Sequence, residues 1–184
     1  MNCYGFQAVS DIADICKDLT CFQKLTEGCR QGEIRPDFPL VEVEIWFHKL
    51  LNEARSFQGD QSPFVQATAF AIELIIHMFW SSHQEKIDPT LVASRMKEAL
   101  CRLQIRPCSY MDLTSCHFMI GAIASDERSQ ARTWFVSKLR RAVRALRARG
   151  WENPLDIVER GFVPDLNLSI RLKALWEEVS LKCC

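Results

Sequence analysis

Glu73 and His77 are the residues best placed for chemistry in this sequence, because they stand four positions apart within an apolar run. Residues at this spacing share one face of a helix. A carboxylate and an imidazole there could bind a metal ion together with a third ligand, such as His48 or His83. The alternative is a hydrogen-bonded pair with a structural role, which is the more common arrangement on a buried helix. We expect the structural pair, and therefore no metal site, no cofactor and no catalytic residue.

The cysteines could hold zinc or form disulfides, but their spacing argues against both. The nine residues are Cys3, Cys16, Cys21, Cys29, Cys101, Cys108, Cys116, Cys183 and Cys184. No two of them are separated by the two-residue gap of a zinc knuckle. Their odd number and their positions within apolar runs indicate buried free thiols in a reducing compartment.

Sequence signatures of enzymes are missing as well. The sequence has no glycine-rich phosphate loop, no aspartate-rich diphosphate motif and no serine or cysteine nucleophile motif. It therefore favours a binding protein over an enzyme.

A basic surface is predicted between Asp126 and Arg149, where eight basic residues against two acidic ones leave a local charge of +6. The whole chain is balanced, with 23 basic and 23 acidic residues. Six arginines form the candidate contact surface, namely Arg128, Arg132, Arg140, Arg141, Arg144 and Arg147. They could contact nucleic-acid phosphates or an acidic protein, or they could pair within the molecule with Glu152, Asp156 and Glu159. We favour intramolecular pairing, because no base-reading element accompanies the arginines.

A small apolar effector is a second kind of ligand that the sequence allows. Aromatic and methionine side chains from two apolar segments could line a pocket. The candidates are Phe70, Leu74, His77, Met78, Phe79, Met111, Phe118 and Met119. The alternative is that these side chains fill a packed core.

The elements that must position these residues are all expected to be helices. Apolar residues recur at spacings of three and four in almost every segment. Ser62 and Asp88 are expected to cap helices whose first residue is a proline. The expected helices run from about Val9 to Gly28, Leu40 to Phe57, Pro63 to Trp80, Pro89 to Pro107, Asp112 to Ser125 and Asp126 to Gly150, with a last one through Leu168 to Val179. We therefore predict an all-α fold, with residues 1–184 forming a single helical domain of about seven helices.

The segment from Phe64 to Trp80 is apolar nearly all round and could be taken for a membrane span. It falls short of the roughly 20 apolar residues that a span needs, and it contains Glu73 and His77. We expect it to be a central buried helix, with no membrane association. The N-terminal segment also lacks the basic start and apolar run of a signal peptide.

One set of positions follows the order of a known family pattern. An apolar helix leads to a glycine and a small residue, an acidic residue and an arginine open a long helix, and a glycine, an asparagine and a tryptophan follow. These positions are Phe118, Ile120, Gly121, Ala124, Glu127, Arg128, Gly150, Asn153 and Trp176, with Tyr4-Gly5-Phe6 and the run Ile12-Ala13-Asp14-Ile15 as a further match. Together they resemble the C-terminal half of the fungal-specific transcription factor domain, the helical regulatory region of fungal binuclear zinc-cluster regulators.

The resemblance implies a non-catalytic regulatory domain that binds a protein partner or a small effector, with homodimer formation as one option. It also implies the nucleus as location, with the cytoplasm as the alternative. The family reads DNA through six closely spaced cysteines that hold two zinc ions, and this chain lacks that cluster. Direct sequence-specific DNA binding is therefore not expected. A stand-alone small-molecule-binding protein or biosynthetic helper, of the isomerase or cyclase kind, is the alternative function.

Overall fold

The computed structural model describes residues 3–30, 40–79, 87–103, 111–147, 153–158 and 166–181, and all regular elements in these ranges are helices. The prediction of an all-α fold is therefore confirmed. The described part contains eight α-helices and one 3-10 turn, against the seven or so helices expected. They are α1 (Cys3–Arg30), α2 (Leu40–Ser56), η1 (Phe57–Gly59), α3 (Pro63–Phe79), α4 (Pro89–Arg102), α5 (Met111–Ala124), α6 (Gln130–Arg147), α7 (Pro154–Val158) and α8 (Leu166–Leu181).

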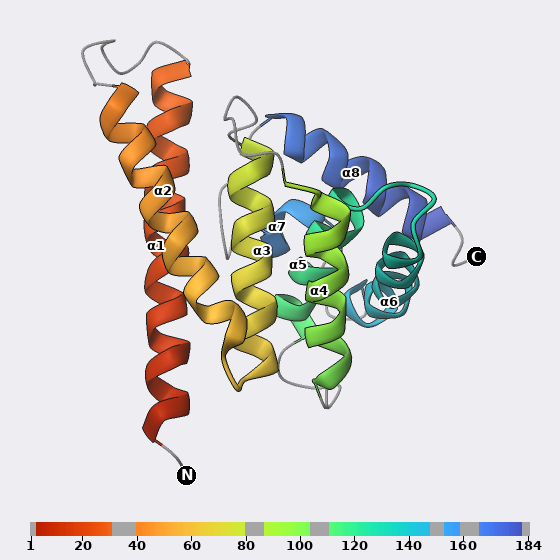
Figure 1. Cartoon of the computed structure of the whole chain (residues 1–184). Coiled ribbons are helices and arrows are strands. Elements are labelled where there is room, and N and C mark those ends of the chain that lie inside the picture. Colours follow the sequence, from red (N-terminus) through yellow and green to blue (C-terminus); the bar gives the residue numbers. More distant parts are fainter. Residues whose placement is uncertain are drawn as a thin grey trace.

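Helix α3 lies in the middle of the bundle and packs against α1, α2, α4 and α5 (Figure 1). Nearly all of its side chains between Val65 and Ile76 are buried, because neighbours cover it on several sides. The expected central buried helix is thus confirmed. No helix in the described ranges combines the length and apolar character needed to cross a membrane.

Helices α1 and α2 pair at one edge of the bundle, whereas α6 and the C-terminal end of α8 lie at the opposite edge (Figure 1). The buried face of α1 consists of Ile12, Ile15, Leu19 and Phe22. The ring of Phe22 meets Trp46 of α2 edge-on, with the centroids 5.5 Å apart. One continuous hydrophobic core reaches from these residues to Val179 of α8.

Apolar and polar residues alternate at the start of α2, as in a strand, but the segment forms the helix that was predicted from Leu40 to Phe57. Val43 is buried together with Phe47, while Val41 and Ile45 are exposed. In a strand these four alternating residues would share one face. Packing of the later apolar residues of α2 therefore overrides the local alternation, and two large apolar side chains are left on the surface.

Three helices begin in the same way, with a polar capping residue followed by proline. The Asp88 carboxylate accepts hydrogen bonds from the backbone N–H groups of Thr90 and Leu91, at 2.9 and 3.3 Å. Ser62 Oγ accepts from the Val65 backbone N–H at 3.5 Å, so both expected caps are found. Asn153 caps α7 in the same manner, accepting from the Leu155 N–H at 3.1 Å. This third signal accounts for the extra helix that we did not predict.

Helix α6 begins four residues later than predicted, because a serine side chain caps it. Residues Asp126 to Ser129 form a turn in which the Ser129 N–H donates to the Asp126 carbonyl at 2.9 Å. Ser129 Oγ then accepts from the Arg132 N–H at 3.1 Å. The acidic residues thus precede the helix instead of forming its first turn.

Helices α5 and α6 approach closely at Gly121. The ring of the fully buried Phe135 lies over this glycine, and a Cβ built there would be 2.4 Å from the ring carbon Cζ. Close packing at this point fixes the position of α6, and with it the position of the arginines that α6 carries.

Candidate functional site

The candidate arginines of α6 divide into two groups, and the first group binds α8. Arg132 donates two hydrogen bonds to the carboxylate of Glu178, at 2.7 and 3.5 Å. Arg140, two turns further along α6, places Nη2 3.7 Å from the same carboxylate. The three side chains are only 23 to 33% exposed, so water screens them less than it screens a free surface pair. This cluster ties α6 to α8.

The second group faces solvent. Arg141, Arg144 and Arg147 are exposed, and none of them has an ion-pair partner among the described residues. Arg128 is exposed in the turn before α6. We call Arg141, Arg144 and Arg147 the arginine surface; their spacing of three residues places them along one side of the helix.

The arginines were expected to pair within the molecule, but the acidic residue that binds them is not one of the three predicted. Asp156, one of the three acidic residues named for this role, instead accepts a hydrogen bond from the side chain of Asn153 at 3.0 Å. Glu152 and Glu159 lie outside the described residues. The partner that the structure provides is Glu178, which is 46 residues from Arg132 in sequence.

A pocket of about 510 Å³ lies beside this cluster, between the C-terminal end of α5 and α8. Its apolar part is formed by side chains of α5 and α8. Its polar part is formed by the turn before α6 together with charged side chains of α6 and α8. The lining residues are Ala122, Ile123, Ala124, Ser125, Asp126, Glu127, Arg132, Arg171, Ala174, Leu175 and Glu178. Apart from Arg132, none of them was predicted to belong to a contact surface or a pocket.

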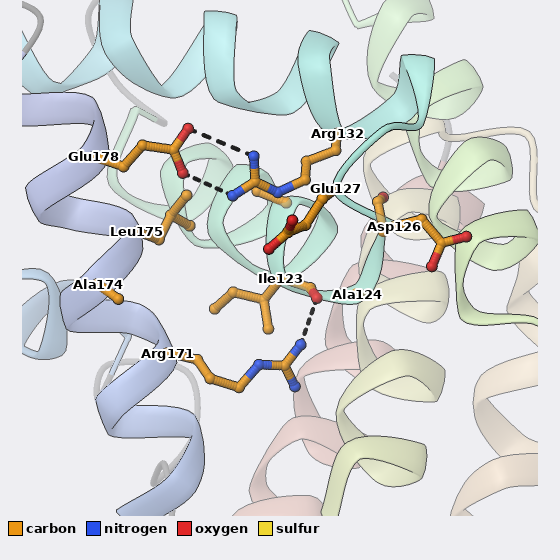
Figure 2. Close-up of a pocket in the computed structure, with 11 residues that line it drawn as sticks. Ile123, Ala124, Asp126, Glu127, Arg132, Arg171, Ala174, Leu175 and Glu178 are labelled. Carbon is orange, nitrogen blue, oxygen red and sulfur yellow. Dashed lines mark hydrogen bonds and ion pairs between the residues drawn. The ribbon is translucent and has the colours of Figure 1, made fainter.

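Charged side chains of both signs meet in this pocket (Figure 2). Arg171 Nη2 donates to the Ile123 carbonyl at 2.6 Å, which satisfies an acceptor at the C-terminal end of α5. The carboxylate of Glu127 points into the space between Arg132 and Arg171, whereas Asp126 points away toward α4. Among the described residues neither acidic side chain has an ion-pair partner.

Glu73 has a structural role, but not the partner that we expected. Both of its carboxylate oxygens accept hydrogen bonds from the preceding elements, one from Arg55 at 2.8 Å and the other from Gln58 at 2.5 Å. The expected Glu73–His77 pair was therefore wrong. His77 lies one turn further along, edge-on to the ring of Phe47 at 6.1 Å. The network joins α2 and η1 to the buried face of α3.

The described residues contain no group of three His, Cys, Asp or Glu side chains that could hold a metal ion. Of the third ligands considered for Glu73 and His77, His48 is exposed and stacks edge-on against Phe47 at 5.2 Å. His83 lies outside the described residues.

The side chains proposed to line an apolar effector pocket contribute mainly to the core. Phe70, Leu74, Phe118 and Met119 are all buried in it. Met78 and His77 are partly buried, while the side chains of Phe79 and Met111 lie outside the described residues. None of these residues lines the pocket between α5 and α8. A cavity among them stays a prediction.

A further buried polar contact links α3 to α5. Thr68 Oγ1 donates to the Phe64 carbonyl at 2.9 Å and lies 3.1 Å from Nε2 of the buried His117. Because the hydroxyl proton is used within α3, Thr68 accepts from a protonated Nε2.

The cysteines with described side chains fall into two exposed and two more enclosed thiols. Cys21 and Cys101 are exposed. Burial raises the pKa of Cys16 to about 11 and the pKa of Cys116 to about 12, the latter with a smaller contribution from Cys16 itself. All four are free, as predicted, but the prediction that they are buried was wrong for Cys21 and Cys101, which lie on the exposed faces of α1 and α4.

No protein-family model, no curated protein and no solved structure matches this chain. The resemblance to the fungal-specific transcription factor domain therefore stays a prediction. Three of the positions that carry it have packing or capping roles: Gly121 lies under Phe135, Asn153 caps α7, and Trp176 is buried in α8.

Proposed function

We propose that this chain is a non-catalytic regulatory domain that binds an acidic protein segment through the arginine surface of α6. The observation that supports this proposal is the division of the arginines. Arg132 and Arg140 are held by Glu178, while Arg141, Arg144 and Arg147 lie on one exposed side and have no ion-pair partner among the described residues. In a chain without net charge, such a local excess favours association with a negatively charged surface.

The resemblance to the regulatory region of fungal transcription factors agrees with this function and adds the nucleus as its location. Since the sequence contains no zinc-cluster motif, we propose protein and not sequence-specific DNA as the partner. Mutual approach of two such surfaces would be repulsive, so a homodimer formed through the arginine surface is disfavoured.

The test is binding of a fluorescein-labelled peptide of ten glutamates, followed by fluorescence anisotropy at low salt. The triple variant Arg141→Gln, Arg144→Gln, Arg147→Gln is compared with Lys24→Gln, Arg95→Gln, Lys173→Gln, which removes the same charge from α1, α4 and α8. We expect about tenfold weaker binding for the first variant, at roughly 0.5 kcal/mol for each exposed pair, and a much smaller change for the control.

Two outcomes would contradict the proposal. Equal losses in both triple variants would show that only net charge matters and that α6 offers no specific surface. Tighter binding to a 20-base-pair duplex than to the peptide, with a steep salt dependence, would identify nucleic acid as the partner instead.

A second candidate function is a stand-alone small-molecule-binding protein, and the pocket beside α8 is the observation that favours it. A volume of about 510 Å³ is in the range of small-ligand sites. The isomerase or cyclase variant of this alternative stays a prediction.

A further inference from the structure

Helix α8 presents a row of uncharged, apolar side chains to solvent. Leu166 and Ile170 stand one turn apart and are 69% and 59% exposed, although both are large and apolar. Ala174 stands one turn further along and is exposed as well. Leu168 and Leu172, two residues to either side of Ile170, are buried in the core. Because residues two apart lie on opposite sides of a helix, Ile170 is at the middle of the exposed side.

The row changes from large to small side chains along its length, and the small end borders a recess. Ala174 lines the pocket between α5 and α8, together with Ile123 of α5 and Leu175 of α8. Figure 2 shows Ala174 and Leu175 on α8, with Ile123 beside them. A large apolar side chain, Leu166, and a small residue at the edge of a recess therefore lie four residues to either side of Ile170.

These two features fit each other when α8 packs against α8 of a second copy. In an antiparallel pair with Ile170 at the twofold axis, position 166 of one copy lies opposite position 174 of the other. Rows of residues spaced four apart are the ridges that align when two helices cross at about −50°, which is the commonest packing angle. Leu166 of each copy then covers Ala174 of the other. The exposed Asn167 and Lys173 flank the row as a polar rim.

A second exposed apolar pair, on α2, lacks such a counterpart. Val41 and Ile45 are exposed one turn apart. The position one turn beyond them is Lys49, a long charged side chain that lies 3.8 Å from Glu53. A symmetric pair centred on Ile45 would place Lys49 over Val41 and would remove its charge from water. Of the two rows, only the one on α8 is self-complementary.

We propose that the chain forms a homodimer through antiparallel α8 helices, in which Leu166 of each copy covers the edge of the pocket of the other. Because only three residues form the apolar row, we expect an interface below the roughly 1,200–2,000 Å² of stable complexes. The dimer is therefore weak and dissociates on dilution. This inference does not rest on the proposed function, since the arginine surface of α6 takes no part in the contact.

Sedimentation velocity of the full chain between about 1 μM and about 1 mM tests the proposal. We expect the sedimentation coefficient to rise with concentration toward that of a dimer. Ile170→Glu places two like charges at the axis and should raise the dissociation constant at least about tenfold. The matched control is Ile45→Glu, which alters a similarly exposed side chain of α2 and should dimerise like the unmodified chain. A monomer at every concentration, or equal losses in both variants, would overturn the proposal.

The register of the two helices is tested by a pair of opposite charges. Leu166→Lys alone should weaken the dimer, because it removes the side chain that covers Ala174. Adding Ala174→Glu supplies two ion pairs across the interface by symmetry, so the double variant should dimerise about fivefold more tightly than Leu166→Lys. Positions 166 and 174 are eight residues apart and are too distant to pair within one helix. Equal dissociation constants of the single and double variants would refute the antiparallel register.

The dimer and the arginine surface can fail separately. The Arg141, Arg144 and Arg147 triple variant should dimerise like the unmodified chain, and Ile170→Glu should retain binding of the acidic peptide. Loss of dimerisation in the arginine variant would place the interface on α6 and would contradict a dimer through α8.

Discussion

Phe135 leaves no room for a side chain at position 121, since a Cβ there would lie 2.4 Å from its ring. Gly121→Ala should therefore force Phe135 or the α5 backbone to move, at a cost of about 1–3 kcal/mol in the free energy of unfolding. Urea denaturation followed by circular dichroism would measure this change. The control is Gly59→Ala, where nothing lies within 4 Å of the added Cβ. A cost for Gly121→Ala no larger than that of the control would contradict close packing of α5 on α6.

Glu73 illustrates how a buried charge depends on its partners. Its side chain is only 6% exposed, and Glu73→Gln would leave Arg55 without its carboxylate in a partly enclosed position. We expect a loss of about 1–3 kcal/mol in the free energy of unfolding. The control Glu53→Gln removes an exposed pair with Lys49, whose atoms are 3.8 Å apart, and should change stability by about 0.5 kcal/mol or less. Similar values for both variants would show that the Arg55 contact adds nothing.

Because Cys16 and Cys116 are enclosed, we expect the free energy of unfolding to decrease in alkaline solution. Burial raises the pKa of Cys16 from 9.0 to about 11 and that of Cys116 to about 12. In the unfolded chain both thiols ionise near the ordinary value, so the stability they contribute is complete below pH 9 and is lost as pH rises toward 11–12. Urea midpoints between pH 8 and pH 10.5 should decrease, and less so for Cys116→Ala. An equal decrease in that variant would exclude this thiol as a cause.

At the scale of elements, a polar residue followed by proline determines where several of the helices begin. Asp88→Ala removes the acceptor for two backbone N–H groups of α4 and should cost about 1 kcal/mol in the free energy of unfolding. The exposed Glu98 on the same helix serves as the control, and Glu98→Ala should change stability by less than about 0.5 kcal/mol. A thermal melt of the two variants would distinguish them, and equal melting temperatures would contradict the capping role.

Helix positions were predictable because they depend on neighbours in sequence. Ser62-Pro63 and Asp88-Pro89 gave the starts of α3 and α4, and apolar spacing gave the buried faces of α2, α3 and α8. The start of α6 was missed because two signals compete there. Asp126 and Ser129 can both cap a helix, and the structure uses Ser129.

Contacts between helices were not predictable, because periodicity shows which face is buried but not what covers it. Glu73 was predicted to pair with His77 on its own helix, whereas Arg55 of the neighbouring helix α2 binds it. In the same way, Glu178 binds Arg132 from a helix far along the chain. The pocket beside Glu127 belongs to this class as well, since three separate segments form it.

At the scale of the whole molecule, the central α3 and the peripheral α1 should differ in local stability. Helix α3 packs against four other α-helices, whereas the main contacts of α1 are with α2 and α3. Segments with fewer contacts open more often than the whole protein unfolds. We therefore expect hydrogen exchange measured by mass spectrometry to be slowest in α3 and faster in α1.

Two phenylalanines test whether the edge helices α1 and α2 form a separate cooperative unit. Phe22→Ala removes the contact of α1 with Trp46, and its cost of about 3–5 kcal/mol should accelerate exchange in α1 and α2 while α5 and α6 keep their protection. Phe135→Ala removes the ring that packs over Gly121 of α5. Because α5 contacts α3, α4, α6 and α8, this variant should accelerate exchange throughout the core. If Phe22→Ala accelerates exchange in α5 and α6 as much as in α1, the bundle unfolds as one unit. In that case a ligand in the pocket beside α8 would stabilise α1 as strongly as the helices that it touches.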